Sequence, residues 1–463
     1  GDFGTGLATV ELVATQARRG SRVLFGDPVV LPSIDAPSPP PRPAHAVVIV
    51  VVDGVERPEM PPWNAAPAPL LATFGDLAVT ATVFDHHRAP TTVVPAVVAS
   101  LLTGLPPREH GLVDLAARLP PSVATLATVA RDASVRTAMF TGVPTTFRAF
   151  GFAEGWEKFV EFTPPSGDPA IAPIDAATAW ITEVAHAANE PRMLAVVHAR
   201  GGHPPWDVVD ATTLPPKDYT GFVDPRRAAQ TLGKMRHRRK KEPLAETDRV
   251  RIHALEQVAL GGQDHAIGAL VSSLKTANLW DTTLFIVTGD VSSGASDDAL
   301  FGDGLPLTEQ VLTLPLYVHF PGSVHAAERV KEPTEIVDLT RTVVDALGLS
   351  FARSIDARDL GRVADNPNGA ASAPQIATLG ERYAARWGSV VVSGRFPKPP
   401  AVCDLAVDPV CAFDRRDLMP VSTYAVFQRI VAADVAARAR GSVREPATLD
   451  PETLAALNVW GSD

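Results

Sequence analysis

The sequence is poor in cysteine and in aromatic residues, and it has no long apolar run. Among 463 residues there are two cysteines and four tyrosines, and aromatic residues make up 6%. The strongest apolar runs, Val47 to Val52 and Val93 to Leu105, are shorter than the roughly 20 residues that a membrane-spanning helix needs. We therefore expect no membrane span within this chain.

An excess of positive charge is missing as well. The formal net charge is -10 and the pI is near 5.7, so no global basic field exists to hold a nucleic-acid backbone. We expect no nucleic-acid partner. The remaining composition, 46% hydrophobic and 20% charged, is typical of a soluble globular protein with a large core.

The two cysteines and the first residue leave questions open. Cys403 and Cys411 lie in a stretch that reads as two short strands around a turn, where a disulfide and two unpaired thiols are both compatible with the spacing. The chain begins with Gly1 rather than Met, and no signal-peptide pattern follows. This start fits a fragment or a processed product.

Buried strands alternate with helical segments along the middle of the chain. Continuous apolar runs without polar alternation are typical of strands covered on both faces of a parallel sheet, and they occur at 47–52, 193–197, 283–288 and 314–320. Helical spacing precedes them, most clearly from Arg249 to Ala277, where Gly261-Gly262 interrupts the pattern. The pattern predicts an α/β fold, a doubly wound and mainly parallel sheet with helices on both faces.

Three other regions flank or interrupt this predicted domain, which we place at 46–369. Residues 1–45 form an N-terminal extension that ends in a proline-rich linker. Residues 208–248 read as a surface excursion near His203, and their basic run at 236–241 fits either a solvated helix face or a site for an anionic partner. Residues 370–463 predict a small C-terminal α+β subdomain, with an antiparallel sheet and a helix near 421–437.

Two acidic residues follow buried strands. Asp53 ends the strand at 47–52, and Asp290 follows the strand at 283–288 through Gly289. Ligands of open α/β sheets bind at the carboxyl edge, and two carboxylates that meet there are usually held by a divalent cation. We predict that Asp53 and Asp290 are metal ligands, roughly 4 to 7 Å apart. The alternative is that each only caps a helix or forms a turn.

Two adjacent hydroxyls precede a predicted helix. Thr91 and Thr92 stand just before the helix that starts near Pro95. A hydroxyl ahead of a helix can attack an anionic substrate that the helix N-terminus attracts, and a nearby metal activates it. The alternative is that Thr91 or Thr92 caps this helix.

Several motifs occur in the order found in one known family. The chain resembles the sulfatase branch of the alkaline-phosphatase superfamily and the related nucleotide-pyrophosphatase-like phosphodiesterases, over roughly residues 46 to 430. The matching segments are Leu101-Leu102-Thr103-Gly104 with Pro106 and His110-Gly111; Val47 to Asp53; Val197-His198 through His203-Pro204-Pro205-Trp206; Gln263 to Gly268 and Trp280 to Asp290; and Leu314 to Gly322 with Val337 to Leu349.

The chain departs from that family at positions that carry chemistry. The family places Cys or Ser, matured to formylglycine, two residues before the proline, and Val93 or Val94 stands there in the two alignment frames. The Arg that follows the proline in the family is Val97 here. Gly54 replaces a second carboxylate, Val291 replaces His or Asn, and Asp303-Gly304 replaces His-Gly. Valine has no lone pair for a metal, so the predicted site has fewer ligands than the family's.

The resemblance implies a hydrolase of sulfate or phosphate esters, with small-molecule or glycan esters as substrates. Asp53 and Asp290 would hold Ca²⁺, Mg²⁺, Mn²⁺ or Zn²⁺, and Thr92, or else Thr91, would attack. His203 would steady the oxyanion, and His198 would contribute to substrate binding. The alternatives are an ordinary loop histidine at 203 and, for the whole chain, a catalytically impaired binding or structural module. The resemblance also favours an extracytoplasmic location.

Overall fold

A computed structural model describes residues 43–64, 71–163, 171–203, 206, 211–227, 231, 244–292, 305–367, 374–395, 398–415, 430 and 444–460. Most of the N-terminal extension, the basic run at 236–241 and the predicted helix near 421–437, apart from Ile430, lie outside the described residues.

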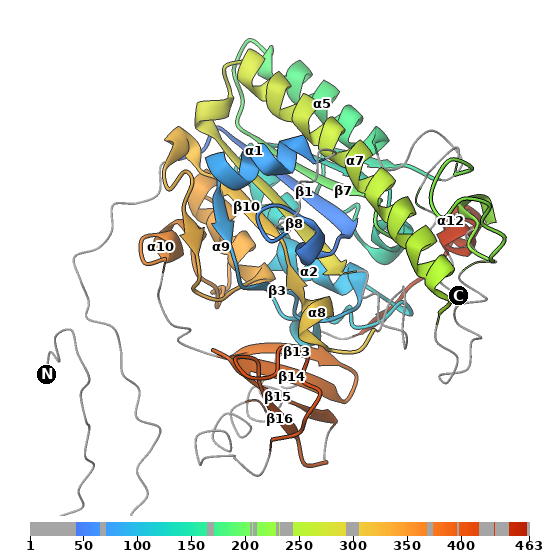
Figure 1. Ribbon diagram of the computed structural model, residues 1–463. Coiled ribbons are helices and arrows are strands. Elements are labelled where there is room, and N and C mark those ends of the chain that lie inside the picture. Colours follow the sequence, from blue (N-terminus) through green and yellow to red (C-terminus); the bar gives the residue numbers. More distant parts are fainter. Residues whose placement is uncertain are drawn as a thin grey trace, which may run out of the picture. The chain divides into compact units, whose positions relative to one another are not determined.

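A central sheet of eight described strands has the order β11, β2, β10, β8, β1, β7, β5, β6 (Figure 1). The strands are β1 (Ala46–Gly54), β2 (Thr82–Phe84), β5 (Arg136–Thr141), β6 (Lys158–Glu161), β7 (Met193–Ala199), β8 (Thr283–Ser292), β10 (Leu316–His319) and β11 (Arg329–Val330). β1 pairs in parallel with β7 and β8, and β5 pairs in parallel with β7 and β6. β10 runs antiparallel to β8 and β2. The predicted mainly parallel sheet is confirmed.

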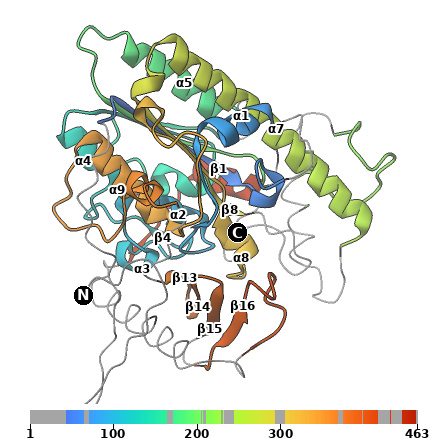
Figure 2. The same ribbon diagram turned by 60° about the vertical axis from the view of Figure 1, so that its left-hand side comes forward.

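Helices cover both faces of this sheet, as Figures 1 and 2 show. Val47, Ile49 and Val51 of β1 belong to one core cluster, and Val48 and Val50 belong to another. Both faces of β1 are therefore buried, which explains its lack of polar alternation. The helices with core residues on the first face include α2 (Val94–Thr103), α4 (Leu126–Asp132) and α9 (Ile336–Leu347), and those on the second include α1 (Ala72–Thr80), α5 (Ala172–Ala185) and α7 (Glu246–Thr276).

The helix predicted over 249–277 is α7, and it runs without a break through Gly261-Gly262. Its N-terminal half packs against the described part of the predicted excursion, where Val223, Leu244 and Leu255 share a small hydrophobic cluster. Most residues of 211–227 are nevertheless partly or fully exposed. In the described part of the chain, no helix combines the length and the apolar character needed to cross a membrane.

The C-terminal region contains the expected antiparallel sheet. Its strands are β13 (Gln375–Leu379), β14 (Arg382–Trp387), β15 (Val390–Arg395) and β16 (Ala401–Asp404). Cys403 of β16 forms a disulfide with Cys411. The chain then returns to the main domain, because β17 (Glu445–Pro446) pairs with β4 (Ala117–Arg118) and helix α12 (Pro451–Trp460) follows. A third small sheet joins β3 (His87–Arg88) to β9 (Thr313–Leu314) and β12 (Thr334–Glu335). The remaining short helices include α3 (Pro107–His110), α8 (Glu309–Leu312) and α10 (Leu360–Ala364).

Candidate metal centre and active site

Three side chains that can bind a metal meet at the carboxyl edge of the sheet. Asp53, His198 and Asp290 offer ligand atoms that all lie within 4.8 Å of one another, and all three residues are buried. The predicted proximity of Asp53 and Asp290 is confirmed. His198 joins them from β7, although the sequence resemblance implied a role for it in substrate binding.

Strand order explains why these residues meet. β7 and β8 are the two parallel neighbours of β1, and Val51 of β1 lies level with both His198 and Thr288. Asp53 and Asp290 each lie two residues beyond that level, at the ends of adjacent strands. Three strands therefore deliver three polar groups to one point, within a sheet that is otherwise apolar at its centre.

Hydrogen bonds fix the orientation of the Asp290 carboxylate. Its Oδ1 atom accepts from the backbone N–H of Gly54 at 3.1 Å and from that of Val291 at 2.5 Å. Its Oδ2 atom lies 3.0 Å from Nε2 of His198. Asp290 thus uses one oxygen for the backbone and directs the other toward the imidazole.

The other side of the His198 ring is held by a threonine that the sequence analysis did not identify. Nδ1 of His198 lies 3.0 Å from Oγ1 of Thr146, which donates to the Val143 carbonyl at 3.0 Å. Oγ1 of Thr146 also lies 2.6 Å from Oγ1 of Thr141, and when its proton goes to the Val143 carbonyl it can accept from Nδ1–H. Nε2 then presents a lone pair to the carboxylates, which is the tautomer that a metal-binding histidine needs.

Two of the departures from the family pattern have structural reasons. Gly54 has φ +64°, and a Cβ atom there would lie 2.8 Å from the backbone nitrogen of His203. A second carboxylate at this position is therefore excluded by the close approach of the 202–203 loop. Val291 belongs to the hydrophobic core cluster of the α2 face, where an imidazole or an amide would be buried among apolar side chains.

The predicted nucleophiles lie at the N-terminus of α2, but they do not cap it. The N-cap residue is Val93, and no side chain caps the helix. Thr92 is fully buried, and its Oγ1 donates to the Leu305 carbonyl at 2.7 Å; Thr91 is buried as well. The hydrogen bond holds the Thr92 hydroxyl in one orientation and leaves its oxygen lone pairs available.

His203 lies on the loop that contacts the end of β1. The backbone N–H of Gly202 donates to the Asp53 carbonyl at 2.9 Å, and Nε1 of Trp206 donates to the Gly202 carbonyl at 2.9 Å. His203 itself is 6% exposed. The structure therefore places this histidine on a packed loop next to Asp53.

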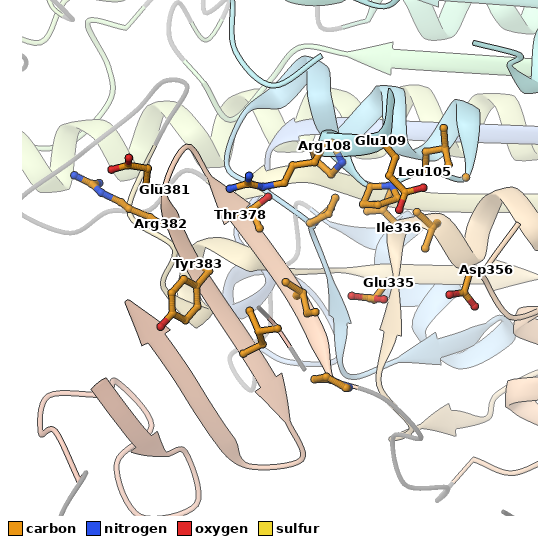
Figure 3. Close-up of a pocket in the computed structure, with 18 of the residues that line it drawn as sticks. Leu105, Arg108, Glu109, Glu335, Ile336, Asp356, Thr378, Glu381, Arg382 and Tyr383 are labelled. Atoms are coloured by element: carbon orange, nitrogen blue, oxygen red, sulfur yellow. The ribbon is translucent and has the colours of Figure 1, made fainter. Parts of the chain in front are cut away.

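A cavity of about 280 Å³ lies between the main domain and the C-terminal sheet (Figure 3). Leu105, Ile336 and Tyr383 line it together with the acidic residues Glu335 and Asp356. Burial, aided by Asp338, raises the pKa of Glu335 to about 7. None of Asp53, His198 and Asp290 lines this cavity. We therefore place the candidate reaction site at the three metal-binding side chains and not in this cavity.

Comparisons with known proteins agree with the geometry. The sequence profile of the Sulfatase family matches residues 45–349. The fold is similar to that of the phosphonate monoester hydrolase of Agrobacterium radiobacter, with 18% identity, a TM-score of 0.65 and coverage of 89% of this chain and 100% of that one. It is also similar to BT4656, solved with its substrate D-glucosamine-2-N,6-O-disulfate, with 14% identity, a TM-score of 0.66 and coverage of 86% and 98%.

A third similar structure is a protein of the alkaline phosphatase superfamily from Vibrio parahaemolyticus, with 13% identity, a TM-score of 0.53 and coverage of 91% and 88%. No curated protein matches the sequence. The profile covers well over half of the chain, and the sheet, its helices and the strand-end carboxylates follow the same order as the sequence motifs. The chain belongs to the sulfatase family.

Proposed function

We propose that this protein is a metal-dependent hydrolase of sulfate or phosphate esters, and that Asp53, His198 and Asp290 bind its divalent cation. The observation that carries the proposal is the burial of two carboxylates and one imidazole within 4.8 Å of one another. Two buried carboxylates at this distance repel each other strongly unless a cation or a proton lies between them.

The contact between His198 and Asp290 supports a cation. Nε2 and Oδ2 are 3.0 Å apart, a separation that suits two neighbouring ligands of one ion with bonds of about 2.1 Å. With Nδ1–H donated to Thr146, both facing atoms carry lone pairs, so they repel unless the ring gains a second proton or a cation binds both. The donor set therefore fits a metal ion.

The imidazole also bears on which metal binds. Ca²⁺ and Mg²⁺ prefer oxygen ligands alone, whereas Zn²⁺ and Mn²⁺ accept a mixture of imidazole and carboxylate. We expect Zn²⁺ or Mn²⁺ to bind more tightly than Ca²⁺ or Mg²⁺. In this assignment His198, on the strand β7, replaces the metal ligand that the family has at the position of Val291.

The chain's own groups then have the following roles. A divalent cation, when bound, supplies Lewis-acid polarisation of the ester group and lowers the pKa of an adjacent hydroxyl. Thr92, whose hydroxyl is held by the Leu305 carbonyl at the N-terminus of α2, would attack the sulfur or phosphorus atom as the bond to the ester oxygen breaks, and the alcohol would leave with the hydroxyl proton. Water would then hydrolyse the threonine ester and restore Thr92. His203 donates to the oxyanion from the loop beside Asp53. Thr91, which has the same chemistry one residue earlier, is the second choice of nucleophile.

A catalytically impaired binding module is the second candidate, and a specific observation favours it. Neither alignment frame gives a hydroxyl or a thiol at the family's nucleophile position, which holds Val93 or Val94, and both valines are buried. In that case the metal centre would recognise a sulfate or phosphate ester without cleaving it.

Turnover after removal and return of metal distinguishes the two candidates. The protein is treated with a chelator, and hydrolysis of an aryl sulfate, a phosphomonoester and a phosphodiester is measured with Zn²⁺, Mn²⁺, Ca²⁺ or Mg²⁺. We expect hydrolysis of at least one ester with Zn²⁺ or Mn²⁺ and none without metal. Tight metal binding without any turnover supports the binding module instead.

A further inference from the structure

A second group of charged side chains lies at the same edge of the sheet as the metal centre. β2 runs parallel to β1, because β10 between β2 and β8 is antiparallel to both, so Asp85 and His86 follow the carboxyl end of β2. β2 is two strands from β8 and three from β1. At about 4.8 Å between neighbouring strands, this group is roughly 10 to 14 Å from the metal centre.

The group brings together arginines from distant parts of the chain. Nη1 of Arg57 donates to the Asp85 carbonyl oxygen at 2.7 Å, and Nη2 of Arg386, on β14, lies 3.4 Å from Nδ1 of His86. Ion pairs in the group join Arg329 to Asp85 at 2.5 Å and Arg386 to Glu309 at 3.2 Å.

Positive charge exceeds negative charge in this group. Arg88 also pairs with Glu309, at 2.7 Å, and its side chain is 2% exposed. Among the described residues of the group, the guanidinium groups of Arg57, Arg88, Arg329 and Arg386 face the carboxylates of Asp85 and Glu309, and Glu335 lies level with Arg88 across the β3–β12 pair. Burial, the largest effect, raises the pKa of Glu335 to about 7 although Arg88 lowers it, so four positive groups still face fewer than three full negative charges near pH 7. Because Arg88 and Arg386 are largely buried, water compensates this excess less well than it would on an open surface.

Donors that an anion could use remain in the group. Nε of Arg57 is buried and has no hydrogen-bond partner among the described atoms. His86 is neutral near pH 7, since burial, followed by Arg386 and Arg57, lowers its pKa to about 4. With Nδ1 accepting from Arg386, the proton of the neutral ring lies on Nε2, which can donate. A buried donor left without a partner costs free energy that a bound anion would recover.

We propose that Arg57, His86 and Arg386 form an anion-binding subsite for a sulfate, phosphate or carboxylate group. The subsite holds a second negative charge of the substrate, about 10 Å or more from the ester that is cleaved at Asp53, His198 and Asp290. Arg386 comes from the C-terminal sheet, so this sheet contributes directly to substrate selection. The statement about the substrate rests on the proposed function, whereas anion binding itself does not.

Anion binding is tested with the metal centre disabled. Asp290→Asn protein, treated with a chelator and kept at low ionic strength, is titrated with inorganic sulfate by calorimetry. We expect saturable binding that weakens about tenfold in Arg57→Ala and in Arg386→Ala, the loss of one charge-assisted hydrogen-bonding group. Arg395→Ala is the matched control, because Arg395 lies on the same small sheet but is 62% exposed and pairs with Glu381.

Absence of saturable binding, or equal affinity in all variants, overturns the subsite. Arg57→Lys and Arg386→Lys keep the charge and guard against loss of folding. In protein with the metal centre intact, an ester that carries a second anionic group should show a lower KM than a singly charged one, and Arg386→Ala should remove the difference with little change in kcat. Anion binding without this KM difference overturns the substrate role and leaves the metal centre untouched.

Discussion

The carboxyl edge of the sheet carries opposite charges at two places. At the ends of β1, β7 and β8, two carboxylates and an imidazole are buried together. Near the end of β2, four guanidinium groups lie around the carboxylates of Asp85 and Glu309, with Glu335 next to Arg88. The first place suits a cation and the second an anion. An ester with a metal-bound group at one end and a free negative charge at the other would satisfy both.

The largest expected effect is the loss of turnover at the metal centre when the proposed nucleophile is removed. Thr92→Ala should abolish ester hydrolysis without changing metal affinity, because only the attacking oxygen is lost. Thr91→Ala is the matched control and should retain most of the activity. Initial rates with saturating Zn²⁺ or Mn²⁺ measure both. Full activity in Thr92→Ala would show that another group attacks.

The second prediction concerns Glu309, which pairs with two arginines of the charged group at the end of β2. Glu309 accepts from both Arg88 and Arg386, so Glu309→Gln should lower the free energy of unfolding by about 2 kcal/mol or more. The same change should strengthen sulfate binding, since the positive excess grows. Urea denaturation and sulfate titration measure the two effects. Glu381→Gln, on an exposed pair with Arg395, should do neither; equal effects of both substitutions would contradict a special role for Glu309.

The third prediction concerns Thr146, which orients His198 at the metal centre. Thr146→Val should weaken metal affinity about tenfold, because Nδ1–H loses its acceptor and the ring is less well fixed. Thr145→Val is the control, since the Thr145 hydroxyl is buried but has no hydrogen-bond partner among the described atoms. Competition with a metal-sensitive dye measures both. Unchanged affinity in Thr146→Val would remove Thr146 from the site.

The smallest expected effect is on the pKa of His86. Arg386→Ala should raise this pKa from about 4 toward its ordinary value, but not fully, because burial is the leading cause of the shift. Because the pKa of His86 is lower in the folded protein than in the unfolded chain, the unfolded chain takes up a proton first as the pH falls. The free energy of unfolding therefore decreases as the pH falls from the ordinary histidine pKa toward 4. Proton NMR titration of the ring measures the change, with Arg395→Ala as the control. An unchanged pKa of His86 in Arg386→Ala would show that Arg386 does not act on this ring.

Much of the fold follows from the sequence because of how the sheet is covered. A strand buried on both faces must be apolar at every position, and the run at 47–52 shows this directly. The direction of β10 does not follow, because an apolar run looks the same in a parallel and in an antiparallel strand. The continuity of α7 through Gly261-Gly262 was also not predicted, since packing outweighs the low helix propensity of glycine.

The candidate site was predictable only in part, for a similar reason. Asp53 and Asp290 stand out because each follows a buried strand. The contact between Thr146 and His198 spans 52 residues, and that between His86 and Arg386 spans 300. No local pattern encodes such pairs, because they depend on the strand order and on the position of the C-terminal sheet.

The most direct test of the central claim is metal stoichiometry. Chelator-treated protein is dialysed against Zn²⁺ or Mn²⁺, and bound metal is measured in the wild type, in Asp290→Asn and in the exposed control Asp281→Asn. We predict about one tightly bound cation per chain in the wild type and in the control, and none in Asp290→Asn. Wild-type protein that retains no stoichiometric metal, or Asp290→Asn protein that retains it equally well, would contradict the metal centre.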